Sequence, residues 1–397
     1  MLRRQSYLQK IIDFKDSEFI KVITGVRRSG KSYLLMMYKD YLLESGINEN
    51  QIIYINFEKF VTEPLQTAQA LNNYFNEHID KQQKTYLLLD EIQYVEDWQK
   101  VINSARIEFD CDITITGSNA NMLSGELATR LSGRYVEIKI YPFSFKEFLA
   151  AKFGDNIDQR YLPRYLQEYI RFGGFPAVVL SDENMKETIL SGIFDTVILN
   201  DIASRGEIRD IEVLKRVVSY LAGNVGQIVS TLNISNTLTS SNIKISHPTV
   251  NKYIELMKNA YLLYAAQRYD IRGKQYLSKQ EKYYFVDSGL RHILLDKKQD
   301  NRGQELENLV YLELLRRNYT VEVGKYGEKE IDFIARKFDE LLYVQVTYQL
   351  PEVSTRETDN LLLIKDNFKK IIITQVYEDR TEIAGIPIIN IIDWLLD

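Results

Sequence analysis

Short apolar runs alternate with a helical repeat in the first part of the chain. Phe19–Thr24 (FIKVIT) has the length and composition of a buried strand, and Thr85–Asp90 and Cys111–Gly117 are further runs of this kind. Ser32–Glu44 (SYLLMMYKDYLLE) has the apolar spacing of a helix. We therefore predict an α/β domain with a parallel sheet over residues 1–155.

The pattern changes over residues 156–298. From Asp158 to about Leu238 apolar residues recur at three- and four-residue spacing, which predicts helices. A helix opened by Ser246 and Pro248 follows, and then a β-hairpin that turns near residues 270–274. Helices, a candidate recognition helix and a hairpin together predict a helical and winged-helix domain.

A third predicted domain covers residues 299–397. A helix with Glu307 precedes a strand that contains EIDFIA, residues 330–335, and a second strand LLYVQVTY, residues 341–348. This order resembles the core of PD-(D/E)XK nucleases, in which an Asp on one strand and a D/E-x-K on the next hold Mg²⁺ and activate water. The predicted fold is therefore a small α/β, restriction-endonuclease-like domain.

The nuclease motif is only half present. Asp332 matches the first carboxylate, but Gln345 stands where the second belongs and Thr347 where the lysine belongs. Loss of an anionic ligand weakens a site for a hard cation, and loss of the ammonium removes charge stabilisation at the scissile phosphate. We predict no nuclease activity; Glu307, Glu330 and Asp332 form either a weak metal site or a solvated acidic strand end.

Composition excludes some classes of function. The net charge of −5 over 397 residues gives no global electrostatic case for a nucleic-acid partner. The single Cys111 excludes an internal disulfide, and His78, His247 and His292 are too scattered for a zinc cluster. No apolar run has the length of a signal peptide core or a membrane span, so we expect a cytoplasmic protein without membrane contact.

The clearest chemical signal is GVRRSGKS, Gly25–Ser32, between the first predicted strand and the first predicted helix. In GxxxxGK[ST] the glycines let backbone N–H groups surround phosphates, Lys31 reaches the β and γ oxygens, and the Ser32 hydroxyl binds Mg²⁺. ATP and Mg²⁺ are the expected ligands. The predicted nucleotide-binding residues of this segment are Gly25, Arg27, Arg28, Ser29, Gly30, Lys31, Ser32 and Tyr33.

Asp90, the last residue of the predicted strand Thr85–Asp90, and Glu91, which follows it, lie at the sheet edge that would face the phosphates. Asp90 would hold the magnesium ion, and Glu91 would orient or deprotonate the attacking water. An exposed acidic strand end is the alternative for either residue alone. We predict Asp90 as a metal ligand and Glu91 as a catalytic residue.

Further candidates follow the strand Cys111–Gly117. Asn119, rather than Ser118, has the reach and the neutral donor and acceptor needed to hold the attacking water, although either residue is also a good helix N-cap. Arg130, on a short predicted helix, and Arg134, in the next turn, are candidates for an arginine finger that acts on a neighbouring subunit of a homo-oligomer. Two surface arginines are the alternative.

The segments GVRRSGKS, LLLDEIQ, ITGSN and LSGRY…YPFSFKEF together resemble the AAA+ superfamily, and more narrowly the bacterial and archaeal ATP-binding proteins with a C-terminal domain of unknown function. This resemblance implies Walker A, Walker B and sensor roles for the residues above. It also implies that RFGGFPAVV, Arg171–Val179, is similar to the GxP turn of related switch ATPases, where Pro176 would pack near the adenine. From the residues alone this segment is a tight turn between helices.

Two functions from different classes lead, and a third, an interaction scaffold without catalysis, is disfavoured by the presence of Glu91. The first is a MgATP hydrolase whose nucleotide state controls the C-terminal domains. The second is a DNA-binding or DNA-processing protein in which ATP acts as a conformational switch. There the helix near Thr249 would enter the major groove of duplex DNA with Lys252 facing out, and a wing would carry Arg268, Arg272, Lys274 and Lys279. A lid or a protein-docking surface is the alternative for this module.

Overall fold

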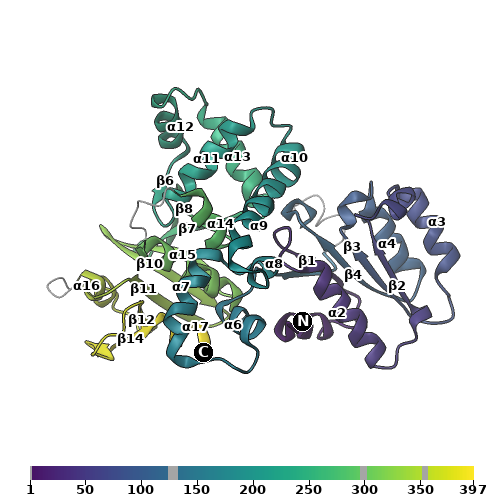
Figure 1. The fold of residues 1–397 in the computed structure, drawn as a ribbon, viewed down its shortest axis with the longest axis horizontal. Helices are drawn as coiled ribbons and strands as arrows, with labels where there is room; N and C mark the ends of the chain where they lie inside the picture. Colours follow the sequence, from purple (N-terminus) through teal and green to yellow (C-terminus); the bar gives the residue numbers. More distant parts are fainter. Residues whose placement is uncertain (1, 124–132, 296–301, 351–355) are drawn as a thin grey trace. The chain divides into compact units, whose positions relative to one another are not determined.

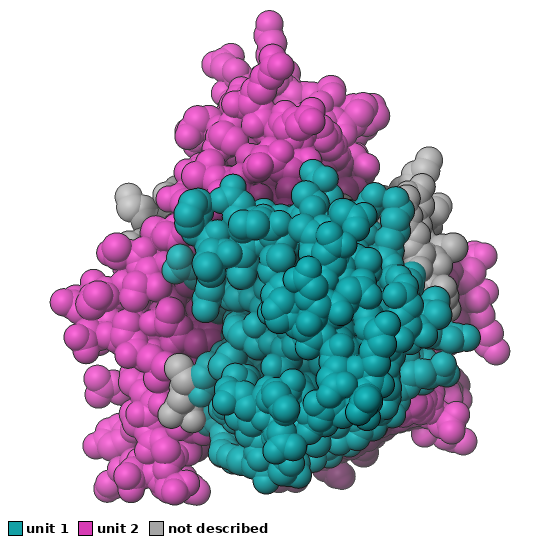
Figure 2. Space-filling model, turned by 90° about the vertical axis from the view of Figure 1, so that its right-hand side faces the viewer, with its two compact units in different colours: residues 1–141, 259–261 teal, residues 142–258, 262–397 magenta. Residues whose placement is uncertain are grey.

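The computed structural model describes residues 2–123, 133–295, 302–350 and 356–397 (Figure 1). Contacts divide the chain into two compact units, which Figure 2 colours separately. Unit 1 comprises the residues up to Tyr141 together with Asn259–Tyr261, and unit 2 comprises Pro142–Lys258 and Leu262–Asp397. The domain boundaries at 155 and 298 stay predictions.

Unit 1 contains a parallel sheet of five strands in its described residues, in the order β2-β3-β4-β1-β5. Both β1 and β3 are buried along their whole length, as expected for strands that are covered on both faces. The predicted parallel α/β sheet is confirmed. The strands are β1 (Ile20–Thr24), β2 (Ile52–Asn56), β3 (Thr85–Asp90), β4 (Cys111–Gly117) and β5 (Tyr135–Lys139).

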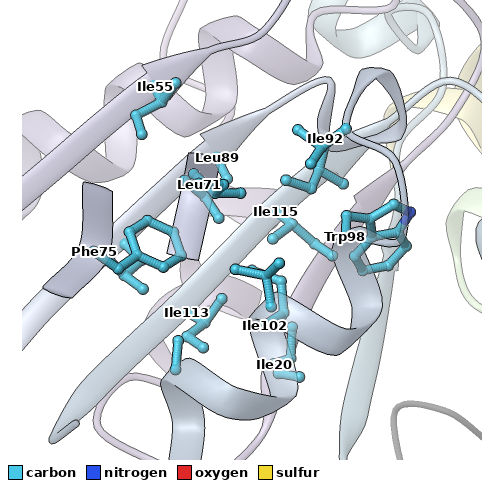
Figure 3. Packing of buried hydrophobic residues seen from close by; sticks show 14 of the residues in the cluster. Ile20, Ile55, Leu71, Phe75, Leu89, Ile92, Trp98, Ile102, Ile113 and Ile115 are labelled. Carbon is cyan, nitrogen blue, oxygen red and sulfur yellow. The ribbon is translucent and has the colours of Figure 1, made fainter. Parts of the chain in front are cut away.

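Helices cover both faces of this sheet because side chains alternate along each strand. Leu87 and Leu89 of β3 pack with α3 (Ala68–His78) and α4 (Trp98–Glu108), and Figure 3 shows Leu89 in one cluster with Leu71, Phe75, Trp98 and Ile102 of these helices. Tyr86 and Leu88 pack instead with α1 (Gln5–Ile12) and α2 (Lys31–Glu44). The apolar run of β3 is thus shared between two cores.

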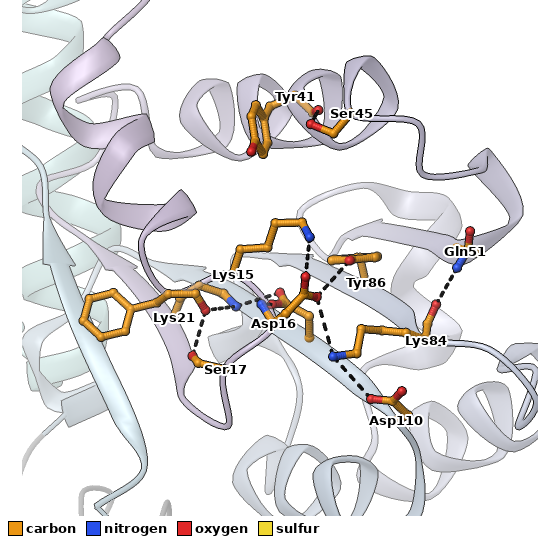
Figure 4. A network of polar contacts seen from close by, with 12 residues as sticks. Lys15, Asp16, Ser17, Lys21, Tyr41, Ser45, Gln51, Lys84, Tyr86 and Asp110 are labelled. Atoms are coloured by element: carbon orange, nitrogen blue, oxygen red, sulfur yellow. Dashed lines mark hydrogen bonds and ion pairs between the residues drawn. The ribbon is translucent and has the colours of Figure 1, made fainter.

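A buried ion pair links β1 to β4 near their first residues (Figure 4). The Lys21 Nζ lies 2.6 Å from the Asp112 Oδ1, and both side chains are fully buried. The other Asp112 oxygen accepts from the Asp16 backbone N–H at 2.8 Å, and the Tyr86 hydroxyl donates to the Asp16 carboxylate at 2.8 Å. The network therefore joins the segment before β1 to β1, β3 and β4.

The helices of unit 2 begin before the predicted helical stretch and continue past it, and no helix in the described ranges is long and apolar enough to cross a bilayer. They are α6 (Phe145–Phe153), α7 (Leu162–Phe172), α8 (Pro176–Val179), α9 (Glu183–Thr196), a π-helical segment (Val197–Ala203), α10 (Ser204–Gly206), α11 (Ile211–Gly223), α12 (Thr231–Ser240), α13 (His247–Asn259), α14 (Ser288–Leu294), α15 (Arg302–Arg316), α16 (Arg356–Leu362) and α17 (Ile391–Leu396).

The described strands of unit 2 form one nine-stranded sheet, in the order β13-β14-β12-β11-β10-β9-β7-β8-β6. The predicted hairpin is β7–β8, and β7 pairs in parallel with β9, so that Arg268 lies opposite Val323. The hairpin thus shares a sheet with strands predicted for another domain. The strands are β6 (Ile228–Val229), β7 (Leu263–Asp270), β8 (Gln275–Phe285), β9 (Thr320–Tyr326), β10 (Lys329–Lys337), β11 (Glu340–Thr347), β12 (Lys369–Thr374), β13 (Glu382–Ile383) and β14 (Ile386–Asn390).

Candidate active site

The loop between β1 and α2 has a backbone that needs its glycines. Gly25 has φ 144° and Gly30 has φ 101°, both in the region that favours glycine. A Cβ at Gly25 would also lie 2.2 Å from the Ile140 carbonyl oxygen, so no side chain fits there. These two residues let the chain turn sharply from β1 into α2.

The N-terminus of α2 directs free backbone donors toward this loop. The first N–H groups of a helix have no partner within the helix, and they carry the positive end of its dipole. Gly30 is the N-cap of α2, and the helix begins at Lys31. The arrangement is suited to an anion such as a phosphate group.

The side chain of Lys31, the first residue of α2, reaches into this loop and is buried. Its ammonium donates to the carbonyl oxygens of Gly25, at 3.2 Å, and Val26, at 3.3 Å. It also lies 3.5 Å from the Glu91 Oε1. The structure therefore brings Lys31 and Glu91 together, as the sequence predicts for a site around a γ-phosphate.

Asp90 is fully buried and is held by three side chains. It accepts hydrogen bonds from the Thr116 Oγ1 at 2.6 Å, from the Asn56 Nδ2 at 2.8 Å and from the Tyr54 hydroxyl at 3.4 Å. Burial raises the pKa of the Asp90 carboxyl, although the hydrogen bonds from Thr116 and Ser32 act in the opposite direction. The two residues predicted to bind Mg²⁺ thus lie near each other, and their carboxylate and hydroxyl oxygens suit this cation.

Glu91 follows directly and is also buried. Its backbone has φ 54°, and its carboxylate accepts a hydrogen bond from the Gln93 amide. Burial acts to raise the pKa of Glu91, but the Lys31 ammonium and the Gln93 hydrogen bond outweigh it, and the pKa is lowered. The side chain is therefore ionised at neutral pH.

Thr116 of β4 connects Asp90 and Glu91. The sequence does not predict Thr116 as a site residue. Its hydroxyl donates to the Asp90 carboxylate and accepts from the Glu91 backbone N–H at 2.9 Å. Leu89 lies opposite Ile115 in the sheet, which brings Thr116 beside Asp90. The alternation of Thr with Ile in the ITITG segment is the one sequence signal for a polar position here.

The other predicted residues of unit 1 occupy varied positions. Arg27 pairs with Glu58 at 2.6 Å, whereas Arg28 is exposed and has φ 66°; Ser29 is buried, and Tyr33 is half-buried on α2.

The predicted sensor and arginine positions follow β4. Ser118 is buried and Asn119 half-buried, and the Asn119 carbonyl accepts from the Met122 N–H at the start of a 3₁₀ turn. Arg134 is partly exposed and lies 3.5 Å from Glu18. Arg130 lies outside the described residues. Water positioning by Asn119 and an arginine finger stay predictions.

Pro176 opens α8 in unit 2, after the turn at Gly173 and Gly174. The buried Asp287 carboxylate accepts from the Gly174 N–H at 2.7 Å and from the Gly289 N–H at 2.9 Å, so it ties this turn to α14. Burial raises the pKa of Asp287 to about 6. The tight turn expected from the two glycines is present, and the adenine contact of Pro176 stays a prediction.

Arg4 is a further buried cation near the loop that the sequence did not indicate. Its guanidinium donates to the Ser29 carbonyl oxygen at 3.1 Å, and its Cζ lies 4.4 Å from the centre of the Tyr7 ring. The residue before α1 therefore supports the loop that precedes α2.

Comparison with known proteins agrees with this geometry. Residues 17–149 match the family described as an AAA domain, and residues 163–301 match a domain of unknown function. An uncharacterized protein of Haemophilus influenzae is 57% identical over 399 residues, which cover 100% of this chain and 99% of that protein. The chain therefore belongs to the same family as this Haemophilus influenzae protein, and its residues 17–149 match an AAA domain. The expected AAA domain is thus confirmed for residues 17–149, and this range contains Gly25–Ser32, Asp90, Glu91 and Asn119.

More distant proteins are also similar to this AAA-domain protein. An uncharacterized protein of Methanocaldococcus jannaschii is 34% identical over 352 residues, which cover 84% of this chain and 76% of that protein. The Walker-type ATPase of Pyrococcus abyssi is 15% identical, with a TM-score of 0.47 over 74% of this chain and 96% of that chain.

Proposed function

We propose that this AAA-domain protein binds MgATP at the β1–α2 loop and hydrolyses it. The observation that carries the proposal is the ion pair of Lys31 with Glu91 beside the N-terminus of α2, with the Ser32 hydroxyl near enough to Asp90 to lower the pKa of its carboxyl. These four side chains come from two distant segments and combine a cation, a hydroxyl and two carboxylates. That combination is the one phosphoryl transfer to water uses.

Each residue has one role in the proposed reaction. The N–H groups at the start of α2 bind phosphate oxygens, and Lys31 exchanges the Gly25 and Val26 carbonyls for the γ-phosphate. Ser32 and Asp90 would hold Mg²⁺, which neutralises phosphate charge when bound. The ionised Glu91 accepts the proton of the attacking water.

The test is steady-state phosphate release by the purified protein, measured with and without Mg²⁺. We expect turnover that requires Mg²⁺. If no phosphate were released at saturating ATP and Mg²⁺, the proposal that the protein hydrolyses ATP would be contradicted.

The second candidate is a DNA-binding protein in which ATP acts as a switch. It is supported by the exposed Arg272 and Lys274 at the tip of the β7–β8 hairpin, after α13. Lys252 is less suited to this role, because its ammonium donates to the Gly206 carbonyl oxygen at 2.8 Å, and the side chain of Lys279 is outside the described part. Stimulation of phosphate release by duplex DNA would favour this candidate, and indifference would favour a protein partner for unit 2.

Arg4 offers a test of how the loop is held. The Arg4→Ala protein is expected to bind ATP about tenfold more weakly, because a hydrogen bond from a charged group to the Ser29 carbonyl is lost. The matched control is Arg3→Ala, since Arg3 is exposed and pairs with the exposed Glu44. Calorimetric titration with ATP measures the affinity of each variant. Equal affinities of Arg4→Ala and Arg3→Ala would show that Arg4 does not position the loop.

A further inference from the structure

A buried lysine in unit 2 lies among carboxylates from two other elements. The Lys282 Nζ on β8 lies 2.8 Å from the Glu330 Oε1 on β10 and 3.1 Å from the Glu307 Oε1 on α15. The Lys282 side chain is only 3% exposed. An ammonium group at this depth is stable only when it is paired and hydrogen-bonded.

The Glu307 carboxylate is held in place on both sides. The Tyr284 hydroxyl donates to its Oε1 at 2.7 Å. Gly226 faces its other oxygen so closely that a Cβ there would lie 2.6 Å from the Oε2. Glu307 therefore has little freedom to turn away from Lys282.

Asp332 adds a third negative charge to this cluster. Its Oδ2 accepts from the Val346 N–H of β11 at 2.8 Å. Burial acts to lower the pKa of Lys282, but Glu307, Asp332 and Glu330 reverse the effect, so the pKa is raised. Lys282 is therefore a permanent cation at neutral pH.

Glu307 and Glu330 contact the Lys282 ammonium and Asp332 acts on it electrostatically; clustered carboxylates of this kind are also what a protein uses to hold a divalent metal. Glu307, Glu330 and Asp332 are the residues that the sequence offered as a weak metal site. Within the described ranges, however, no group of three or more His, Cys, Asp or Glu is arranged to hold a metal ion.

We propose that Lys282 is a built-in cation that replaces a divalent metal ion in this carboxylate cluster. The cluster then needs no metal ion, and it holds none that could assist the cleavage of a phosphodiester. The same ammonium joins β8 to α15 and β10, so it fixes the hairpin to the rest of unit 2.

The proposal is tested by binding of Tb³⁺, a luminescent substitute for divalent cations that nearby tyrosines such as Tyr284 sensitise. The Asp90→Asn background removes the predicted metal ligand of unit 1. In this background we expect no saturable Tb³⁺ luminescence with Lys282 present. The Lys282→Met variant leaves three carboxylates without a cation and is expected to gain saturable Tb³⁺ luminescence.

Two controls separate the loss of a lysine from the loss of this cation. Lys282→Arg keeps the charge and should gain no Tb³⁺ site. Lys186→Met removes another buried lysine of unit 2, 2.8 Å from Glu168, and leaves a single carboxylate that should bind no Tb³⁺.

Two results would overturn the proposal. The first is a folded Lys282→Met protein, judged by circular dichroism, that gains no Tb³⁺ site. The second needs no lysine variant: saturable Tb³⁺ binding by the Asp90→Asn protein that is abolished by Glu307→Gln would mean that the cluster takes a metal beside Lys282.

Discussion

The Glu91→Gln protein is expected to keep its affinity for ATP and to hydrolyse ATP about 10²–10⁴-fold more slowly. Glutamine has nearly the shape of glutamate, so the packing around residue 91 and the hydrogen bond from the backbone to Thr116 remain. Its amide cannot accept a proton from water. The loss should therefore fall on turnover and leave binding unchanged.

Calorimetric titration and phosphate release measure the two effects separately. Glu96→Gln is the matched control, because Glu96 is an exposed carboxylate in the same segment and its change should alter neither quantity. Turnover near the wild-type rate in Glu91→Gln would remove Glu91 from the catalytic role.

The Lys21→Met protein is expected to lose about 3–5 kcal/mol of unfolding free energy. Lys21 and Asp112 are both fully buried, so this change leaves a buried carboxylate without its cation. The Asp112 carboxylate also accepts a hydrogen bond from the Asp16 N–H. The segment before β1 should therefore become less well ordered as well. Urea denaturation followed by fluorescence measures the loss.

A second substitution separates the unpaired charge from the lost packing. In Lys21→Met/Asp112→Asn the residue at 112 is neutral and can still accept from the Asp16 N–H, so most of the stability should return. Lys39→Met is the control, because Lys39 pairs with the exposed Glu49 and its loss should cost about 0.5 kcal/mol or less. A double variant as unstable as Lys21→Met would contradict the electrostatic explanation.

The parts of the site that lie on one continuous segment could be predicted from the sequence. The strand–loop–helix around Gly25–Ser32 and the strand ending at Asp90 carry their own local patterns, and the structure has them at nearly the same positions. Thr116 and Asn56 could not be predicted as partners of Asp90, because their place depends on the strand order β2-β3-β4. Arg4 reaches Ser29 through the packing of α1, which no local pattern reveals.

The same limit explains the sheet of unit 2. The β7–β8 hairpin was recognised from its own residues, but its parallel pairing with β9 joins segments far apart in the chain. Lys282 has the sequence context of an ordinary strand lysine, and only the convergence of β8, α15 and β10 places it among Glu307 and Glu330.

Steady-state phosphate release by the wild-type protein and by Lys31→Ala tests the central claim most directly. We predict Mg²⁺-dependent release by the wild type and a loss of about 10²-fold or more in Lys31→Ala, because the ammonium between the loop and Glu91 is removed. Equal rates in the two proteins would contradict the assignment of this loop as the site of ATP hydrolysis.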